Sequence, residues 1–169
     1  RIGMVTPISD MLRLWTIDSG DEKRDSGNDR DLIPLATPLM ASGYTPSGME
    51  FLTDKMKDFN MVPYSAASAG VDEMPRPLEA GGAVSATLVT GDLKLGAVGT
   101  VTYVDKDHMV AFGHPFLDKG SSSYFMHNSY IFTVVPSRNI PFKLGSVGAE
   151  IGTVNEDRGS GISGLSGKV

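Results

Sequence analysis

The stretch from Leu95 to Gly120 reads LGAVGTVTYVDKDHMVAFGHPFLDKG, and its pattern predicts an antiparallel β-hairpin. β-branched and aromatic residues alternate along 98–104, polar residues occupy 105–107, and a second short apolar run covers 109–112. Alternation, a polar turn and another apolar run in this order are typical of two strands joined by a tight turn. We therefore expect a mainly β protein built around this hairpin.

The predicted hairpin ends on Gly113, His114 and Pro115. Glycine lets the backbone turn or approach another group closely, and proline fixes φ and ends strand pairing. An imidazole titrates near neutral pH, so it can both accept and return a proton. His114 is therefore our main candidate catalytic residue, as a general base. The alternative is a histidine that caps a turn by hydrogen bonding the backbone.

Length and composition restrict the class of protein. The 169 residues suffice for one ordinary domain, or for a domain with an N-terminal extension. The net charge of −5 is spread over the chain and gives no footprint for nucleic acid or an anionic membrane. Without cysteine the chain forms no disulfide, and its apolar stretches are far too short to span a membrane. We expect the sequence to be a fragment that begins and ends within a longer gene product.

Residues 1–76 are predicted to form an N-terminal segment with two helices. The spacing of apolar residues predicts a short amphipathic helix over Pro7–Ile17, and a capping-box spacing of Ser47 and Glu50 predicts a helix over 47–60. Between them, residues 18–31 contain no apolar residue and are predicted to be a disordered loop. Because isolated short helices need a docking surface, we expect this segment to pack on the rest of the chain. A pro-segment or a partner arm is the alternative.

Two further features of the chain concern its strands. Residues 32–43 are apolar but contain Pro34 and Pro38, which predicts an edge strand or an extended crossing segment. Residues 77–169 consist of apolar runs punctuated by Gly and Asp, including 142–149 and 151–154, which predict several short strands. This pattern favours a small β-barrel or a sandwich for 77–169.

Other residues whose side chains could take part in catalysis are weaker candidates. Ser166 lies in a Gly-Leu-Ser-Gly sequence, similar to glycine-flanked turns that present a nucleophilic serine beside an oxyanion hole. Asp118 and Asp157 are candidates for a triad acid by residue type alone. His108 is expected in the hairpin turn, and His127 in a strand, facing either way. The spacing of these groups matches no metal-ligand pattern, and no phosphate loop is present, so we expect neither a metal nor a cofactor.

With these residues identified, the chain resembles a known family. The run PLEAGGAVSATLVTGDLKLGAVGTVTYVDKDHMVAFGHPF (Pro77 to Phe116) is similar to the core of the sporulation stage IV B (SpoIVB) peptidases. Members of that family carry a proline/glycine turn, a strand, a Gly-Asp, a Gly-Thr-Val-Thr strand and a Gly-His exit. IGTVNEDRGSGISG (151–164), MVTPISDMLRLW (4–15) and PLATPLMASGY (34–44) also resemble family segments, so the likeness covers nearly the whole chain.

The resemblance implies a serine endopeptidase on a trypsin-like, two-barrel β fold, which acts on protein substrates in the cell envelope, outside the cytoplasm. The family histidine maps onto His114 as general base. The family serine lies in a Gly-x-Ser-Gly-Ser-Pro motif that this chain lacks, since Ser166 and Gly167 continue as Lys168-Val169. The triad acid is likewise expected beyond Val169. We therefore expect one barrel of the fold and an isolated chain without peptidase activity. The alternative is a non-catalytic envelope β-domain that binds a protein or cell-wall partner.

Overall fold

The computed structural model describes residues 5–17, 36–66, 75–136 and 142–167. The predicted loop at 18–31 lies outside these residues. The elements, in chain order, are α1 (Ile8–Leu12), η1 (Arg13–Thr16), β1 (Thr37–Ser42), α2 (Pro46–Met56), η2 (Lys57–Phe59), β2 (Met61–Ser65), β3 (Ala83–Val89), β4 (Lys94–Asp105), β5 (His108–Ala111), β6 (Gly120–Val135), β7 (Phe142–Arg158) and β8 (Gly161–Ser166).

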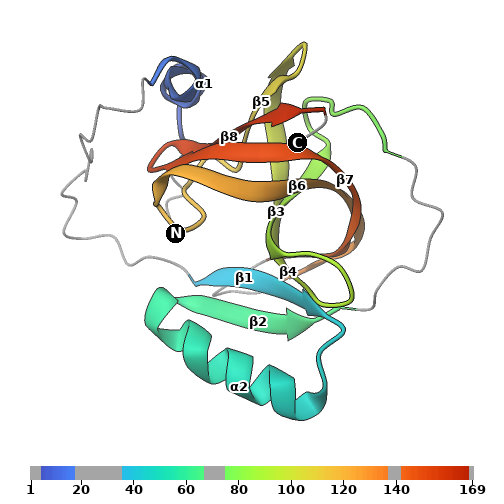
Figure 1. Ribbon diagram of the computed structural model, residues 1–169. Coiled ribbons are helices and arrows are strands. Elements are labelled where there is room, and N and C mark those ends of the chain that lie inside the picture. Colours follow the sequence, from blue (N-terminus) through green and yellow to red (C-terminus); the bar gives the residue numbers. More distant parts are fainter. Residues whose placement is uncertain (1–4, 18–35, 67–74, 137–141, 168–169) are drawn as a thin grey trace.

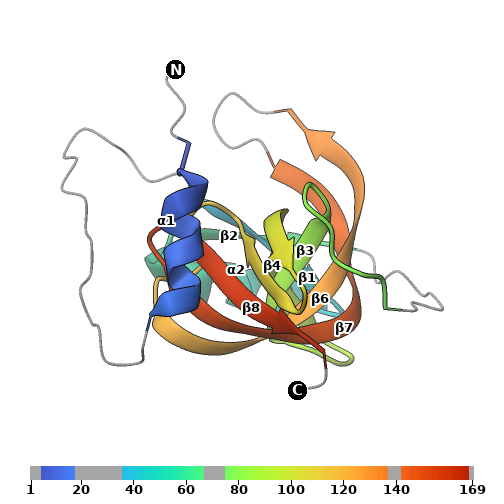
Figure 2. The same cartoon turned by 90° about the horizontal axis from the view of Figure 1, so that it is seen from above.

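These strands form one mixed sheet that closes into a barrel. The strand order is β2-β1-β4-β3-β6-β7-β8-β5, and an additional pairing of β5 with β4 closes a ring of strands (Figure 1). Seen from above, β6 and β7 curve around the interior of the barrel (Figure 2). The fold is therefore mainly β and barrel-like with two helical segments, as the sequence predicts.

The predicted central hairpin is confirmed. β4 and β5 pair antiparallel with Asp105 opposite His108, and Lys106 in the turn between them has a φ of 56°. Val101, Met109 and Ala111 belong to the main hydrophobic core of the barrel. Val110, on the other face of β5, is also fully buried but lies outside that core, so β5 is buried on both faces.

The longest strands differ from expectation. Residues 142–149 and 151–154 do not form separate short strands but belong to the continuous β7. A Cβ on Gly145 would lie 2.3 Å from the Tyr130 carbonyl oxygen, and one on Gly152 would lie 2.0 Å from that of Leu165. These glycines allow neighbouring strands to approach closely while β7 bends around the barrel, so they do not interrupt the strand.

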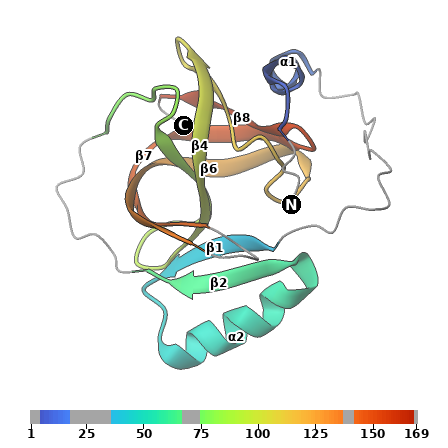
Figure 3. The same cartoon turned by 180° about the vertical axis from the view of Figure 1, so that it is seen from behind.

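A β1-α2-β2 unit extends the sheet below the barrel. β1 and β2 are parallel and joined by α2, and β1 pairs antiparallel with the start of β4 (Figure 3). The prediction that β1 is an edge strand is wrong, because β2 forms the edge. Pro38 is tolerated because β4 pairs only with residues 40–42 of β1, so its missing N–H removes no bond between these two strands.

The second predicted helix is present, but it begins earlier. Thr45 is the N-cap, and its Oγ1 accepts a hydrogen bond from the Gly48 N–H at 3.2 Å. The predicted capping box at Ser47 is therefore wrong. Pro46 explains the earlier start, because its fixed φ suits the first position of a helix.

The first helical segment packs on the barrel, as expected. Met11 and Leu14 are buried, and the Trp15 indole N–H donates to the Met109 carbonyl at 3.3 Å. The Trp15 ring also lies 5.9 Å from that of Tyr103. These contacts supply the docking surface that so short a helix requires. No helix within the described ranges has the length and apolar character needed to cross a bilayer.

Candidate active site

A tight turn carries the histidine. The Gly113 N–H donates to the Ala111 carbonyl at 3.0 Å, and Phe112 between them has a φ of 75°. This is a γ-turn with positive φ, the rarer and more strained form. Gly99 explains how the ring of Phe112 fits, because a Cβ on Gly99 would lie only 2.2 Å from that ring. Backbone strain of this kind is concentrated at functional sites.

The loop after the turn is held by Asp157. This fully buried carboxylate accepts hydrogen bonds from the N–H groups of Phe116 and Leu117, both at 2.7 Å. The Tyr124 hydroxyl donates to it at 3.3 Å, and burial together with the nearby Asp157 charge raises the pKa of Tyr124. Asp157 therefore fixes the path of the chain on the C-terminal side of His114.

His114 itself is exposed, and one ring nitrogen is oriented by the backbone. Its Nδ1 lies 2.8 Å from the Pro115 carbonyl oxygen. A carbonyl oxygen only accepts hydrogen bonds, so the Nδ1 of His114 carries the proton. In the neutral ring, Nε2 then has its lone pair available. This is the form of histidine that acts as a general base.

His114 lies at a cleft of about 300 Å³. β4 contributes residues 97–100, and β1 contributes Thr37 and Pro38. The end of β6 contributes Val134, and the start of β7 contributes Phe142 and Lys143. The Lys143 ammonium donates to the Thr100 hydroxyl, which connects β7 to β4. Tyr64 of β2 completes the wall, with its ring 5.2 Å from that of Phe142. Strands distant in sequence therefore form one recess next to the imidazole.

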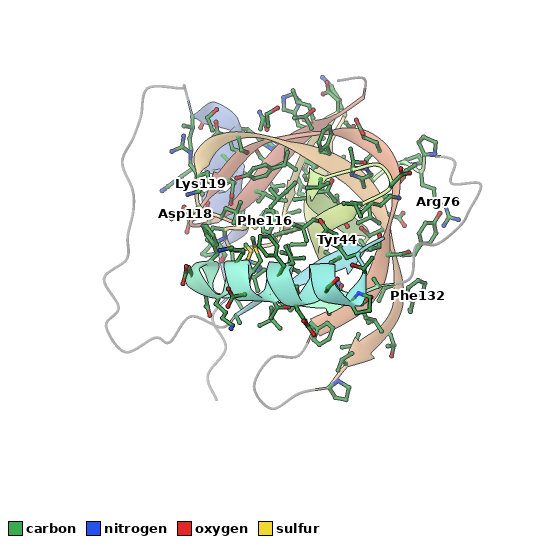
Figure 4. The ribbon with its side chains drawn as sticks, turned by 60° about the horizontal axis from the view of Figure 1, so that its bottom comes forward. Tyr44, Arg76, Phe116, Asp118, Lys119 and Phe132 are labelled. Carbon is green, nitrogen blue, oxygen red and sulfur yellow. The ribbon has the colours of Figure 1, made fainter. Side chains whose placement is uncertain are left out.

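The remaining candidates do not meet His114. Ser166 donates to the Asp107 carbonyl at 3.2 Å, at the end of β5 opposite to His114. The separation along β5 alone is about 10 Å. Asp118 is exposed in the loop, with a φ of 55°. In Figure 4 the side chains of Asp118 and Lys119 lie at one margin of the molecule, while Phe116 lies over α2.

The structure thus brings Asp157 close to the loop that follows His114, which we call the histidine loop. There Asp157 accepts hydrogen bonds from backbone amides and not from the imidazole. Within the described ranges, no carboxylate is seen to bond the imidazole of His114, and no cluster of acidic and histidine side chains could hold a metal ion. The part of the chain described here contains an oriented base beside a recess, without an assembled triad.

A second histidine is buried, which sequence reasoning left open. His127 Nδ1 lies 2.9 Å from the Thr87 hydroxyl, which itself donates to the Phe125 carbonyl, and Nε2 lies 3.3 Å from the Thr90 hydroxyl. Burial, helped by the positive charge of Lys94, lowers the pKa of His127 to about 4. A neutral histidine satisfied by two hydroxyls suits a core role. The sequence did not reveal it because the inward face of β6 depends on register.

Lys143 is a cleft residue that the sequence did not single out. It lies in a strand without a motif, and its contact with Thr100 joins residues far apart in the sequence.

The fold and the site together define a small β-barrel with an oriented, exposed histidine beside a cleft. The chain matches no protein-family model, and no curated protein and no solved structure matches it.

Proposed function

We propose that this chain supplies the general base of a SpoIVB-like serine endopeptidase, acting on protein substrates in the cell envelope, outside the cytoplasm. The observation that carries the proposal is the exposed His114 at the cleft, whose Nδ1 is bonded to the Pro115 carbonyl and whose Nε2 has no hydrogen-bond partner among the residues that the structure describes. The resemblance of Pro77 to Phe116 to that family supplies the reaction class.

The geometry suits the base of acyl transfer. Nε2 of His114 accepts the proton of a serine hydroxyl as the hydroxyl oxygen attacks the peptide carbonyl, and then returns it to the leaving amine. The Pro115 carbonyl keeps the ring oriented through both steps and stabilises the imidazolium, a role that an aspartate has in many triads. The nucleophile is a serine of the full-length gene product other than Ser166, because Ser166 lies at the wrong end of β5.

Hydrolysis of casein by the full-length gene product tests this function. We expect turnover that His114→Ala reduces at least about a thousandfold, as for the loss of a general base in a triad. His108→Ala is the matched control, since His108 is another exposed histidine on the same hairpin, and should retain activity. Equal activity of the His114→Ala protein would contradict the proposal.

The absence of a carboxylate bonded to His114 within the described ranges favours a second candidate function. It is a non-catalytic envelope domain that binds a protein or cell-wall partner. The C-terminal end of β6 supports this function, because Phe132 and Val134 are 57% and 58% exposed and so present apolar surface to a partner. Figure 4 shows Phe132 on the side of the molecule opposite to Asp118. Under this function the full-length product hydrolyses no casein.

A further inference from the structure

Within the described ranges, one side of β4 has no paired strand over residues 97–100, and we call this stretch the free edge of β4. On one side, β3 pairs with β4 along residues 95–100. On the other side, β1 pairs only with residues 94–96 and β5 only with 101–105. Across this gap, Thr100 accepts one bond through its carbonyl, from the Phe112 N–H at 3.1 Å.

The direction of the backbone groups follows from alternation along the strand. Both the N–H and the carbonyl of Val101 bond to the Gly81–Gly82 side, so the same groups of Val98 point the opposite way, into the cleft. If β1 continued its register from Met40 opposite Gly96, Pro38 would lie opposite Val98. Proline has no N–H, so it cannot complete that pairing. The Val98 carbonyl therefore has no donor from Pro38, and among the described residues β1 does not pair with β4 beyond Gly96, so this stretch of β4 can accept an added strand.

The cleft also offers a positive charge. Among the described residues that line it, Lys143 is the one lysine and none is acidic, in a chain whose net charge is −5. The ammonium has three donors, of which Thr100 uses one, so at least one more hydrogen bond can be made to an anion. Val134 and Phe142 beside it present apolar surface.

The size of the cleft favours a chain end. About 300 Å³ lies at the small end of the range for ligand pockets. Extended peptides add to free sheet edges through main-chain hydrogen bonds, and chain ends can be captured through their terminal carboxylate. We propose that this cleft binds the C-terminal end of an extended polypeptide, with its main chain paired to Val98 and its carboxylate on the Lys143 ammonium. The last side chain contacts Val134 and Phe142.

This inference rests on the proposed function only in that both use the cleft beside His114. Peptide binding requires no turnover, so the two fail separately. If the chain binds the peptide but the full-length product hydrolyses no casein, this inference is supported and the peptidase function is contradicted. If the full-length product hydrolyses casein but the chain does not bind the peptide, the peptidase function is supported and this inference is contradicted.

The test is fluorescence anisotropy with the 169-residue chain and N-terminally fluorescein-labelled Gly-Ser-Thr-Val-Thr-Val. We expect saturable binding of the free acid, and at least about tenfold weaker binding of the C-terminal amide, because a charge-assisted hydrogen bond is lost. An amide whose last residue is glutamate distinguishes a side-chain carboxylate from a chain end. It should bind as weakly as the plain amide. N-methylation of the penultimate residue removes a main-chain donor and should also weaken binding.

Lys143→Gln should weaken binding of the free acid at least about tenfold and leave binding of the amide unchanged. Lys55→Gln, on the exposed face of α2, is the control for net charge and should change neither. Thermal melting shows that each variant is folded. Absence of binding, equal binding of acid and amide, or an unchanged affinity of the Lys143→Gln protein would overturn the proposal.

Discussion

Replacing Asp157 by alanine tests whether this carboxylate holds the histidine loop. The change removes the acceptor of the Phe116 and Leu117 N–H groups, each at 2.7 Å, and the partner of the Tyr124 hydroxyl. Hydrogen bonds to a charged acceptor contribute about 1.5–3 kcal/mol each, so the two amide bonds together give about 3–6 kcal/mol. For a chain of this length, that lowers Tm by roughly 6–24 °C.

Urea unfolding followed by circular dichroism measures the free energy of unfolding, and hydrogen exchange at the Phe116 amide measures opening of the loop. We expect both to report a loss in Asp157→Ala. Asp118→Asn is the matched control: Asp118 lies in the same loop but is exposed, and asparagine tolerates its positive φ. It should change stability by less than about 0.5 kcal/mol. A loss below about 1 kcal/mol for Asp157→Ala, with unchanged exchange at Phe116, would show that Asp157 does not hold this loop.

Three further changes test individual parts of the structure. Because burial lowers the pKa of folded His127 from 6.5 to about 4, the unfolded chain binds this proton first. The free energy of unfolding should therefore fall by up to about 3 kcal/mol between pH 6.5 and pH 4, and His127→Gln should remove that dependence in urea titrations. Gly99→Ala places a Cβ against the Phe112 ring, so it should cost about 1–3 kcal/mol in thermal unfolding and weaken peptide binding. Thr45→Ala should cost about 1 kcal/mol in the same assay, and Ser47→Ala less than half of that, if Thr45 caps α2.

The central hairpin could be predicted from sequence because its information is local. Alternation over 98–104 and the polar turn depend only on neighbouring residues, and the structure has both strands at those positions. The N-cap of α2 was missed for a similar local reason, since both Thr45 and Ser47 are suitable residues and only the position of Pro46 decides between them. The continuity of β7 was missed because glycine both ends strands and allows close strand packing.

The candidate site could be predicted only in part. The Gly-His-Pro sequence at 113–115 identified His114 as a candidate. Its hydrogen bond to the Pro115 carbonyl could not be predicted, because that bond depends on the geometry of the loop. The contact between Lys143 and Thr100 joins residues distant in sequence, and the free edge of β4 depends on where two other strands stop pairing. Such properties follow from register and curvature, which a single sequence does not determine.

Labelling with a fluorophosphonate probe, which reacts with activated serines, tests whether His114 activates a serine nucleophile. The full-length gene product, its His114→Ala variant and the isolated 169-residue chain are compared side by side. We expect the full-length product to be labelled, His114→Ala to abolish the label, and the isolated chain to remain unlabelled because Ser166 lies away from His114. Labelling of the isolated chain at Ser166, or labelling of the full-length product that survives His114→Ala, would contradict the proposed role of His114.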